Sequence, residues 1–331
     1  MFNQNQKRIG FACKIQISEY KTDPKLNQSG TTITWLNSKS TDVAHERLWD
    51  LMRANVLALA AQIEWVGQQP PHQRMFRITS DLLPAYTYET YMPFYFQTDV
   101  VDFLEKNLSK IGTRARELDI KLSFHPGQFC VLASEQDQVV ENSITEFEYH
   151  ADIIRYLGYG RSFQDFKCNV HIGGKRGPAG IRAALRRLTP EARNTLTIEN
   201  AEFTWGLDAS LELVKDCALV LDIHHHWIHS GTYIKPSDPK FKQVVDSWRG
   251  VRPTIHYSVS REDVLVDHDA TVLPDLAQLK SMGFTSAKLR AHSEYYWNQA
   301  CNDWALEFLP YADIMCESKQ KNLASQQLAL V

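Results

Sequence analysis

The sequence predicts an α/β fold, a single TIM-type (β/α) barrel. Short β-branched runs alternate with amphipathic stretches from one end of the chain to the other, which indicates parallel strands joined by helices. No Gly/Ser-rich or Pro-rich linker interrupts this alternation, so we expect one domain over residues 1–331. The length of 331 residues allows one large barrel. With 44% hydrophobic and 23% charged residues, the composition excludes disorder, collagen and coiled coil as the main architecture.

Eight runs have the composition and length of strands. They are RIGFACKI (8–15), MFRITS (75–80), IKLSFH (120–125), CNVHI (168–172), LTIEN (196–200), ALVLDI (218–223), PTIHYS (253–258) and ADIMCES (312–318). Between them, apolar residues recur near helical spacing over 44–66, 100–118, 139–157, 181–188, 210–214 and 295–309. These runs and stretches predict the strands and crossover helices of the barrel.

Three segments depart from this rhythm. Residues 18–41 are polar and rich in Ser, Thr and Asn, and we expect a long loop there. The acidic, irregular stretch REDVLVDHDATVLPDL marks an insertion at about 259–287. Residues 322–331 are expected to form a short helical tail.

Charge and cysteine content restrict the class of protein. The formal charge of −3 gives no overall attraction to nucleic acid, so a site for a polyanion must be a local basic patch. Six cysteines are scattered without a CxxC pair, which fits neither a zinc ribbon nor a small disulfide scaffold. No apolar run approaches the roughly 18 residues of a membrane span, and the first residues lack an apolar signal region. We therefore expect an intracellular, cytoplasmic protein with reduced thiols and no membrane partner.

Side chains able to bind metals stand at the ends of nearly all predicted strands. They are His125, His171, Glu199, Asp222 with His225, His256 and Glu317. Residues at the carboxyl ends of barrel strands converge at one mouth, where the active sites of such barrels lie. A mixed set of imidazoles and carboxylates suits Mn²⁺, Zn²⁺ or Fe²⁺. More ligands are present than one ion uses, which indicates two or three ions.

A structural explanation competes for each residue alone. One histidine at the end of an apolar strand is more often a hydrogen-bonded, half-buried side chain than a ligand. The repetition favours metal binding, because several buried carboxylates would be costly without cations to compensate them. His224 and His226 flank His225, and for them a supporting or phosphate contact and a structural role remain equally open.

The motifs resemble those of the UV damage endonucleases, single-domain barrels that nick DNA beside ultraviolet photoproducts. The resemblance extends over most of the chain. Its most specific pieces are SFHPGQFC (123–130), VHIGGKRG (170–177), LTIEN (196–200), LDIHHHW (221–227), IHYS (255–258), RAHSEY (290–295) and IMCESKQK (314–321).

The resemblance implies eight metal ligands and a catalytic group within them. The ligands fall on His125, His171, Glu199, Asp222, His225, His256, His292 and Glu317. Glu199, His256 and Glu317 are the expected catalytic residues. His292 is preferred over His268, because RAHSEY leads into the last crossover helix whereas His268 lies in the expected insertion. Thr254 stands where the family commonly has a lysine.

The resemblance also implies contacts with DNA. Gln128 and Phe129 match the pair that the family inserts into the base stack at the lesion, and Phe11 matches a second aromatic residue. Both phenylalanines replace the tyrosine that is more usual there. Basic residues near the predicted ligands are expected to contact phosphates, although a solvated helix face explains the patch after His171 equally well. They are Lys175, Arg176, Arg290 and Lys319.

These observations predict a DNA repair endonuclease that depends on two or three divalent ions, most simply Mn²⁺, with Zn²⁺ or Mg²⁺ as alternatives. We expect it to act as a monomer on damaged double-stranded DNA, cutting on the 5′ side of photoproducts to leave a 3′-hydroxyl and a 5′-phosphate. The alternatives are an abasic-site endonuclease or sugar isomerase on a similar barrel, or a lesion-binding protein that does not cleave. The pair Gln128 and Phe129 argues against the isomerase, since a closed sugar site needs no wedge.

Overall fold

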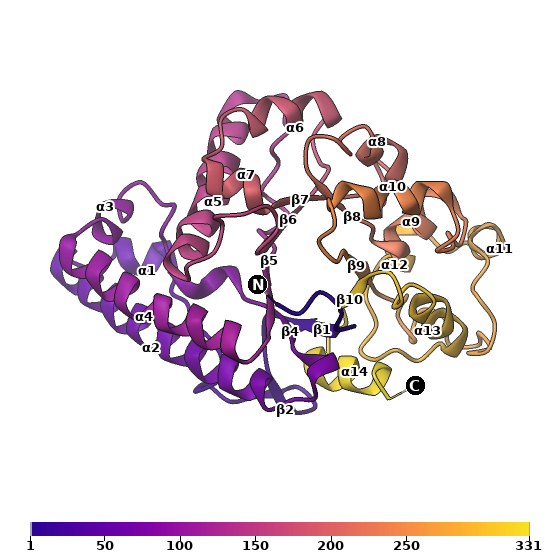
Figure 1. Cartoon of the computed structure of the whole chain (residues 1–331), viewed down its shortest axis with the longest axis horizontal. Helices are drawn as coiled ribbons and strands as arrows, with labels where there is room; N and C mark the ends of the chain where they lie inside the picture. The colour runs from indigo at the N-terminus through magenta and orange to yellow at the C-terminus, as the bar shows by residue number, and fades with distance from the viewer. Residues whose placement is uncertain (1, 331) are drawn as a thin grey trace.

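The computed structural model describes residues 2–330, and its centre is an eight-stranded parallel sheet rolled into a nearly closed barrel (Figure 1). The strand order is β8-β7-β6-β5-β4-β1-β10-β9. The bounds are β1 (Ile9–Ala12), β4 (Met75–Arg77), β5 (Lys121–Phe124), β6 (Lys167–His171), β7 (Leu196–Glu199), β8 (Ala218–Val220), β9 (Thr254–Tyr257) and β10 (Asp313–Cys316). All eight predicted strands are present, and the predicted barrel is confirmed.

The two end strands of the sheet, β8 and β9, meet just beyond the end of β8. A single bridge pairs Asp222 with His256, and the His256 backbone N–H donates to the Leu221 carbonyl at 3.0 Å. The first and last barrel strands in the sequence, β1 and β10, pair side by side through Ile9 with Ile314. Segments from both ends of the chain therefore complete one barrel.

Helices surround the strands as an outer layer (Figure 1). The longer ones are α2 (Thr41–Gly67), α4 (Thr98–Glu117), α5 (Asp137–Tyr156), α6 (Gly177–Leu185), α9 (Ile223–Ser230), α10 (Pro239–Ser247), α13 (Gln299–Leu306) and α14 (Lys321–Leu328). The shorter ones are α1 (Ile33–Asn37), α3 (Met92–Tyr95), α7 (Pro190–Thr195), α8 (Leu207–Leu211), α11 (Leu276–Ser281) and α12 (Ser286–Leu289). Within residues 2–330, no helix combines the length and apolarity that a membrane crossing needs.

Each predicted helical stretch overlaps an observed helix, namely α2, α4, α5, α6, α8 and α13. The prediction also missed α3, α7, α9 and α10. Two of these carry recognisable start signals, because Thr189 and Asp238 cap α7 and α10 with their side chains and a proline follows each of them. Capping residues would therefore have located both helices, although their apolar periodicity is weak.

The irregular segments have more structure than the sequence indicated. Residues 18–41 were expected to be a loop, but this region contains the hairpin of β2 (Gln16–Ser18) and β3 (Lys21–Thr22) and also α1. Residues 259–287 are mostly turns, with α11 and the start of α12 near their end; that they are an insertion stays a prediction. The predicted tail forms α14. Val331, its last residue, lies outside the described residues, as does Met1 of the expected domain.

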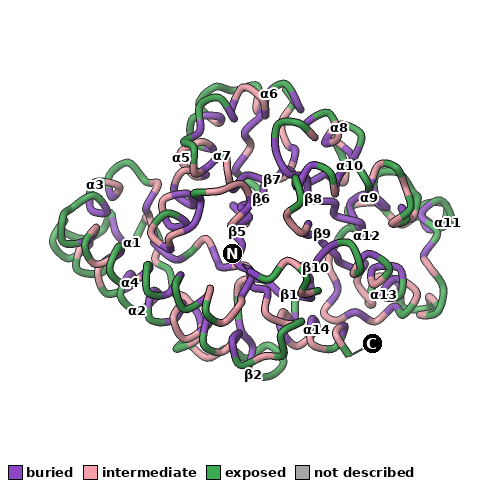
Figure 2. Tube along the Cα trace, viewed as in Figure 1, coloured by how far each residue is buried: buried purple, intermediate pink, exposed green. Residues whose placement is uncertain are grey.

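The apolar core lies mainly between the strands and the outer helices, and the purple strands of Figure 2 show how completely the barrel is covered. Phe11 of β1 exemplifies this packing. Its ring centroid lies 5.2 Å from that of Phe76 on β4 and 6.0 Å from that of Trp65 on α2. Outward-facing side chains thus fix the helices on the barrel.

Much of the inside of the barrel is polar, and its amino-terminal end is closed by charges around Asp313. The Asp313 carboxylate accepts hydrogen bonds from Lys121 Nζ at 2.8 Å, from Arg252 Nε at 2.7 Å and from the Arg8 backbone N–H at 2.9 Å. Asp313 and Lys121 are buried. Such a group is stable only while every charge keeps its partners, because an unpaired buried ion is costly.

We expect Asp313→Ala to lower the free energy of unfolding by about 3–5 kcal/mol, since it leaves the buried Lys121 ammonium without its counter-ion. Urea denaturation measures this loss. Asp246→Ala is the control, because Asp246 forms an exposed pair with Lys242 on α10 and its removal should cost under about 0.5 kcal/mol. Equal stability losses in the two variants would contradict the role assigned to Asp313.

Candidate metal centre

Seven of the eight predicted ligands converge at the carboxyl ends of the strands. They form three overlapping groups in which the potential ligand atoms lie within 4.8 Å of one another. The groups are His125, His171 and Glu199; His125, His256 and Glu317; and Glu199, Asp222 and His225. Glu199 and His125 each belong to two groups, so the groups share side chains.

The fold places most of these residues at or beside the end of a strand. His171 and Glu199 are the last residues of β6 and β7 and are paired in register, and Glu317 directly follows β10. Asp222, expected at the end of a strand, caps α9. Its carboxylate accepts a hydrogen bond from the His225 backbone N–H at 2.7 Å. The cap orients Asp222 and brings His225 toward the same centre.

Several buried polar atoms at this centre have no hydrogen-bond partner among the described residues. They are Oε1 of Glu199, Oδ2 of Asp222 and Nδ1 of His256. A buried polar atom without a partner is unfavourable, and a cation bound by carboxylate oxygens and imidazole nitrogens would satisfy all three. The residues present therefore fit divalent metal ions.

The pKa shifts of Glu199, Glu317 and His256 are also those expected of metal-binding groups. Burial alone would raise the pKa of Glu199, but the imidazoles of His256 and His171 outweigh it and hold that pKa well below its usual value. Burial also works against the Glu317 charge, yet Arg77 keeps the pKa of that carboxyl low. Burial lowers the pKa of His256 to about 4. Ionised carboxylates and a neutral imidazole are the forms that bind metals.

Asp222 behaves differently from the other two carboxylates. Burial raises its pKa well above the usual value, and the negative charges of Glu199 and Glu317 raise it further. Three carboxylates converge here with too little positive charge to ionise all of them. A bound cation would supply the missing charge and favour the ionised form of Asp222.

Three interior residues support the ligands and were not predicted from the sequence. Arg77 on β4 pairs with Glu317, and Asn169 on β6 donates a hydrogen bond to Glu199. The Lys167 Nζ lies 2.7 Å from His256 Nε2, which leaves Nδ1 of that ring facing Glu199 at 3.2 Å. Burial lowers the pKa of Lys167 to about 7.

A signal for two of them was present in the sequence. Lys167, Asn169 and His171 occupy alternate positions of one strand, and alternate residues of a strand point to the same face. Because His171 faces the barrel mouth, the two polar residues before it must line the interior. The residues at the strand ends do not by themselves reveal this periodicity.

The eighth predicted ligand, His292, belongs to none of these three groups. Its pKa is lowered by burial and is also influenced by the charges of Glu317 and His225, so it stands within electrostatic reach of both. His268 is half-buried, and its Nε2 lies 2.8 Å from the Val272 carbonyl. Ligation by His292, rather than by His268, stays a prediction.

The residues expected to insert into or stack on DNA differ in how far they are exposed. Gln128 and Phe129 are exposed on the loop after β5, and Phe129 keeps 85% of its surface exposed. The prediction for Phe11 is wrong. Only 3% of its surface is exposed, because it points from β1 into the outer helical layer, so it does not offer its ring to a base.

The four basic residues expected to bind phosphates are exposed or half-exposed, and each has an acidic partner. The pairs are Lys175 with Glu135, Arg176 with Asp137, Arg290 with Glu202 and Lys319 with Glu294. Exposed ion pairs contribute little stability and exchange readily with other partners. Phosphate contact by these residues stays a prediction.

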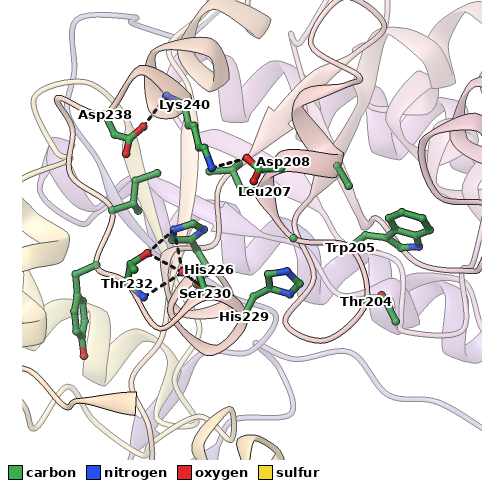
Figure 3. Close-up of a pocket in the computed structure, with 14 residues that line it drawn as sticks. Thr204, Trp205, Leu207, Asp208, His226, His229, Ser230, Thr232, Asp238 and Lys240 are labelled. Atoms are coloured by element: carbon green, nitrogen blue, oxygen red, sulfur yellow. Dashed lines mark hydrogen bonds and ion pairs between the residues drawn. The ribbon is translucent and has the colours of Figure 1, made fainter. Parts of the chain in front are cut away.

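A separate cavity of about 570 Å³ lies beside the centre, between the segment entering α8 and helix α9 (Figure 3). It is lined by His226 and His229, with Lys240 paired to Asp208 across it at 2.6 Å. His224 points elsewhere, and its Nε2 lies 3.1 Å from the Leu289 carbonyl. Of the two histidines left open by the sequence, His224 thus has a structural contact and His226 lines a cavity.

Comparison with protein families supplies the identity that this geometry suggests. The family model described as UV-endonuclease UvdE matches residues 7–330. The chain belongs to this family. Relatives include the UV-damage endonuclease of Schizosaccharomyces pombe, 25% identical over 97% of this chain, and a UV DNA damage endonuclease of Bacillus cereus strain B4264, 23% identical over 90%. The chain spans 50% of the Schizosaccharomyces pombe protein and 86% of the bacterial one.

Solved structures agree with the fold. The crystal structure of SacUVDE superimposes with a TM-score of 0.74 at 23% identity, covering 98% of this chain and 97% of that one. Endonuclease IV from Thermus thermophilus superimposes with a TM-score of 0.51 at 14% identity, covering 82% and 91%. These similarities establish a shared barrel architecture.

We expect Mn²⁺ to stabilise the folded protein, and Glu199→Gln to lose most of that effect, because Glu199 belongs to two of the three ligand groups. An ion at 100 times its Kd adds about 2.7 kcal/mol to the free energy of unfolding. Thermal denaturation with and without Mn²⁺ measures the gain. Glu141→Gln, at an exposed pair with Arg187, is the control. An unchanged Mn²⁺ effect in Glu199→Gln would remove Glu199 from the ligand set.

Proposed function

We propose that this member of the UvdE family is a metal-dependent DNA repair endonuclease. It hydrolyses the phosphodiester on the 5′ side of ultraviolet photoproducts, such as cyclobutane pyrimidine dimers, and leaves a 3′-hydroxyl and a 5′-phosphate. The observation that carries this proposal is the convergence of seven imidazoles and carboxylates at the barrel mouth, with unpartnered buried oxygens among them. Membership of the family gives the chemistry its substrate class.

Two or three divalent ions, with Mn²⁺ the best match to the mixed ligand set, would activate a water molecule, neutralise phosphate oxygens and stabilise the departing 3′-oxygen. The protein supplies the geometry for this. Glu199, His256 and Glu317 are the proposed catalytic residues, and each is fixed by a neighbour inside the barrel. Asn169 orients Glu199, Lys167 holds His256, and Arg77 holds Glu317.

Lesion selectivity is assigned to the exposed loop after β5. A crosslinked photoproduct is already partly unstacked, so it costs less to extrude than an intact pair. Gln128 and Phe129 would enter the gap left in the stack, as apolar wedges do in other DNA-bending proteins. The loop lies next to His125, so a wedge there places the damaged strand beside the metal centre. We propose damaged double-stranded DNA as the partner and a monomer as the acting form.

The purified protein should nick supercoiled plasmid that has been irradiated, only when Mn²⁺ is present, and should leave unirradiated plasmid intact. The dependence on metal follows from the buried ligand groups, and the dependence on damage from the cost of extruding paired bases. Agarose gel electrophoresis of relaxed and supercoiled forms measures both. A chelator should abolish the nicking, and renewed Mn²⁺ should restore it.

Each other outcome would point to a different activity for this protein. Equal nicking of both plasmids would contradict lesion specificity, and nicking that survives the chelator would contradict the metal mechanism. Nicking confined to plasmid carrying abasic sites would favour an abasic-site endonuclease. Binding to irradiated DNA without cleavage would favour a lesion-binding protein.

Phe129→Ala should weaken binding to lesion-containing DNA by about five- to hundredfold, because stacking of a base on an aromatic ring contributes roughly 1–3 kcal/mol. The variant should keep its melting temperature, since Phe129 is exposed and fills no core space. Fluorescence anisotropy with a dimer-containing duplex measures the affinity.

Tyr311→Ala is the matched control for Phe129→Ala. Tyr311 is 54% exposed but lies just before β10, at the opposite end of the barrel. A large loss of thermal stability with normal affinity for lesion DNA in Phe129→Ala would show that the wedge assignment is wrong.

A further inference from the structure

A second exposed aromatic residue, Phe203, stands at the barrel mouth on the segment after β7. It follows the ligand Glu199 by four residues, and 49% of its surface is exposed. The preceding residue, Glu202, has a pKa lowered in part by the charges of His225 and His171, although burial opposes this. The neighbourhood of Phe203 is therefore within electrostatic reach of two predicted ligands.

The segment that carries Phe203 is held firmly in place. The Ala201 backbone N–H donates to the Trp205 carbonyl at 2.9 Å and closes the loop. The Trp205 indole N–H donates to the Gly174 carbonyl at 2.7 Å and attaches the loop to the segment after β6. Because the loop is anchored on both sides of Phe203, little conformational entropy remains to be lost when a ligand covers the ring.

Arg290 covers part of the Phe203 ring. The guanidinium carbon lies 5.1 Å from the ring centroid, and Glu202 fixes the guanidinium by an ion pair. This distance is within the range of a cation–π interaction. Arg290 was expected to contact a phosphate, but here its partners are Glu202 and Phe203. The cation supports an aromatic surface that remains accessible from solvent.

Phe129 follows β5 and Phe203 follows β7, and these two strands are the neighbours of β6 in the sheet, so their loops flank residues 172–176 after β6. The stretch after β5 contacts this segment through Ala133, whose carbonyl accepts a hydrogen bond from the Arg176 backbone N–H at 2.9 Å. The stretch after β7 contacts the same segment through the Trp205 indole N–H, which donates to the Gly174 carbonyl. Single exposed aromatic residues are common on protein surfaces, but two anchored ones flanking a metal-binding strand are not explained by core packing.

From this placement we infer that Phe203, supported by Arg290, is a second stacking site for DNA that binds an unpaired nucleobase across the end of β6 from the loop of Phe129. The inference rests on the proposed function, since it takes its ligand from a damaged duplex. An aromatic ring accepts any base, because every base has a π face. The residue would thus hold a strand in place without reading its sequence.

The test uses Phe203→Ala, Phe203→Leu and Phe203→Trp, with Tyr311→Ala as the control. We expect alanine and leucine to weaken binding to a dimer-containing duplex by about five- to hundredfold and tryptophan to preserve it. Leucine keeps apolar bulk but removes the π face, so it separates stacking from apolar contact. All variants should keep the wild-type response to Mn²⁺.

A spectroscopic measurement locates the contact. 2-Aminopurine placed at successive positions around the lesion loses fluorescence when it stacks, and Phe203→Ala should restore fluorescence at a position that Phe129→Ala leaves unchanged. The inference is overturned if Phe203→Ala binds within twofold of wild type, or if leucine preserves affinity. Failure of the wild-type protein to prefer irradiated plasmid would instead overturn the proposed function.

Discussion

The burial of the Glu199 carboxylate is the constraint that organises this molecule. Its side chain is 0% exposed, and an isolated charge in such a place would be strongly unfavourable. The surrounding interior is built to compensate it, with four imidazoles within 3.7 Å of its oxygens and an amide donor from Asn169. Many barrels of this type fill their interior with branched aliphatic residues. Here polar and charged side chains occupy much of it, and the apolar core is mostly displaced to the outside of the strands.

The sequence was sufficient for the barrel because each strand is a short apolar run that ends in a polar side chain. It was also sufficient to predict most of the candidate ligands, because the carboxyl ends of the strands must meet at one mouth of a parallel barrel. It failed inside the strands, where Lys167 and Asn169 were treated as ordinary positions. Helix α9 was missed for a related reason, since the run of histidines has no apolar periodicity and its cap, Asp222, was understood only as a ligand.

The two phenylalanines expected to stack on DNA show how position within an element decides a side chain's environment. Phe11 lies within β1, where alternate residues face the helices, and its ring is covered by Trp65. Phe129 lies beyond the end of β5, where no neighbouring strand or helix covers it. A resemblance in residue type could not distinguish these cases, because it carries no information about which face of a strand a residue occupies.

The joint between β8 and β9 has a mechanical consequence. Every other neighbouring pair of barrel strands is paired by residues within the named strands, whereas this pair meets through a single bridge between Asp222 and His256. Both bridging residues belong to the ligand groups. The weakest seam of the barrel is therefore also part of the candidate metal centre. Asp222 and His256 would hold a bound ion across this seam, which would link occupancy of the centre to closure of the ring.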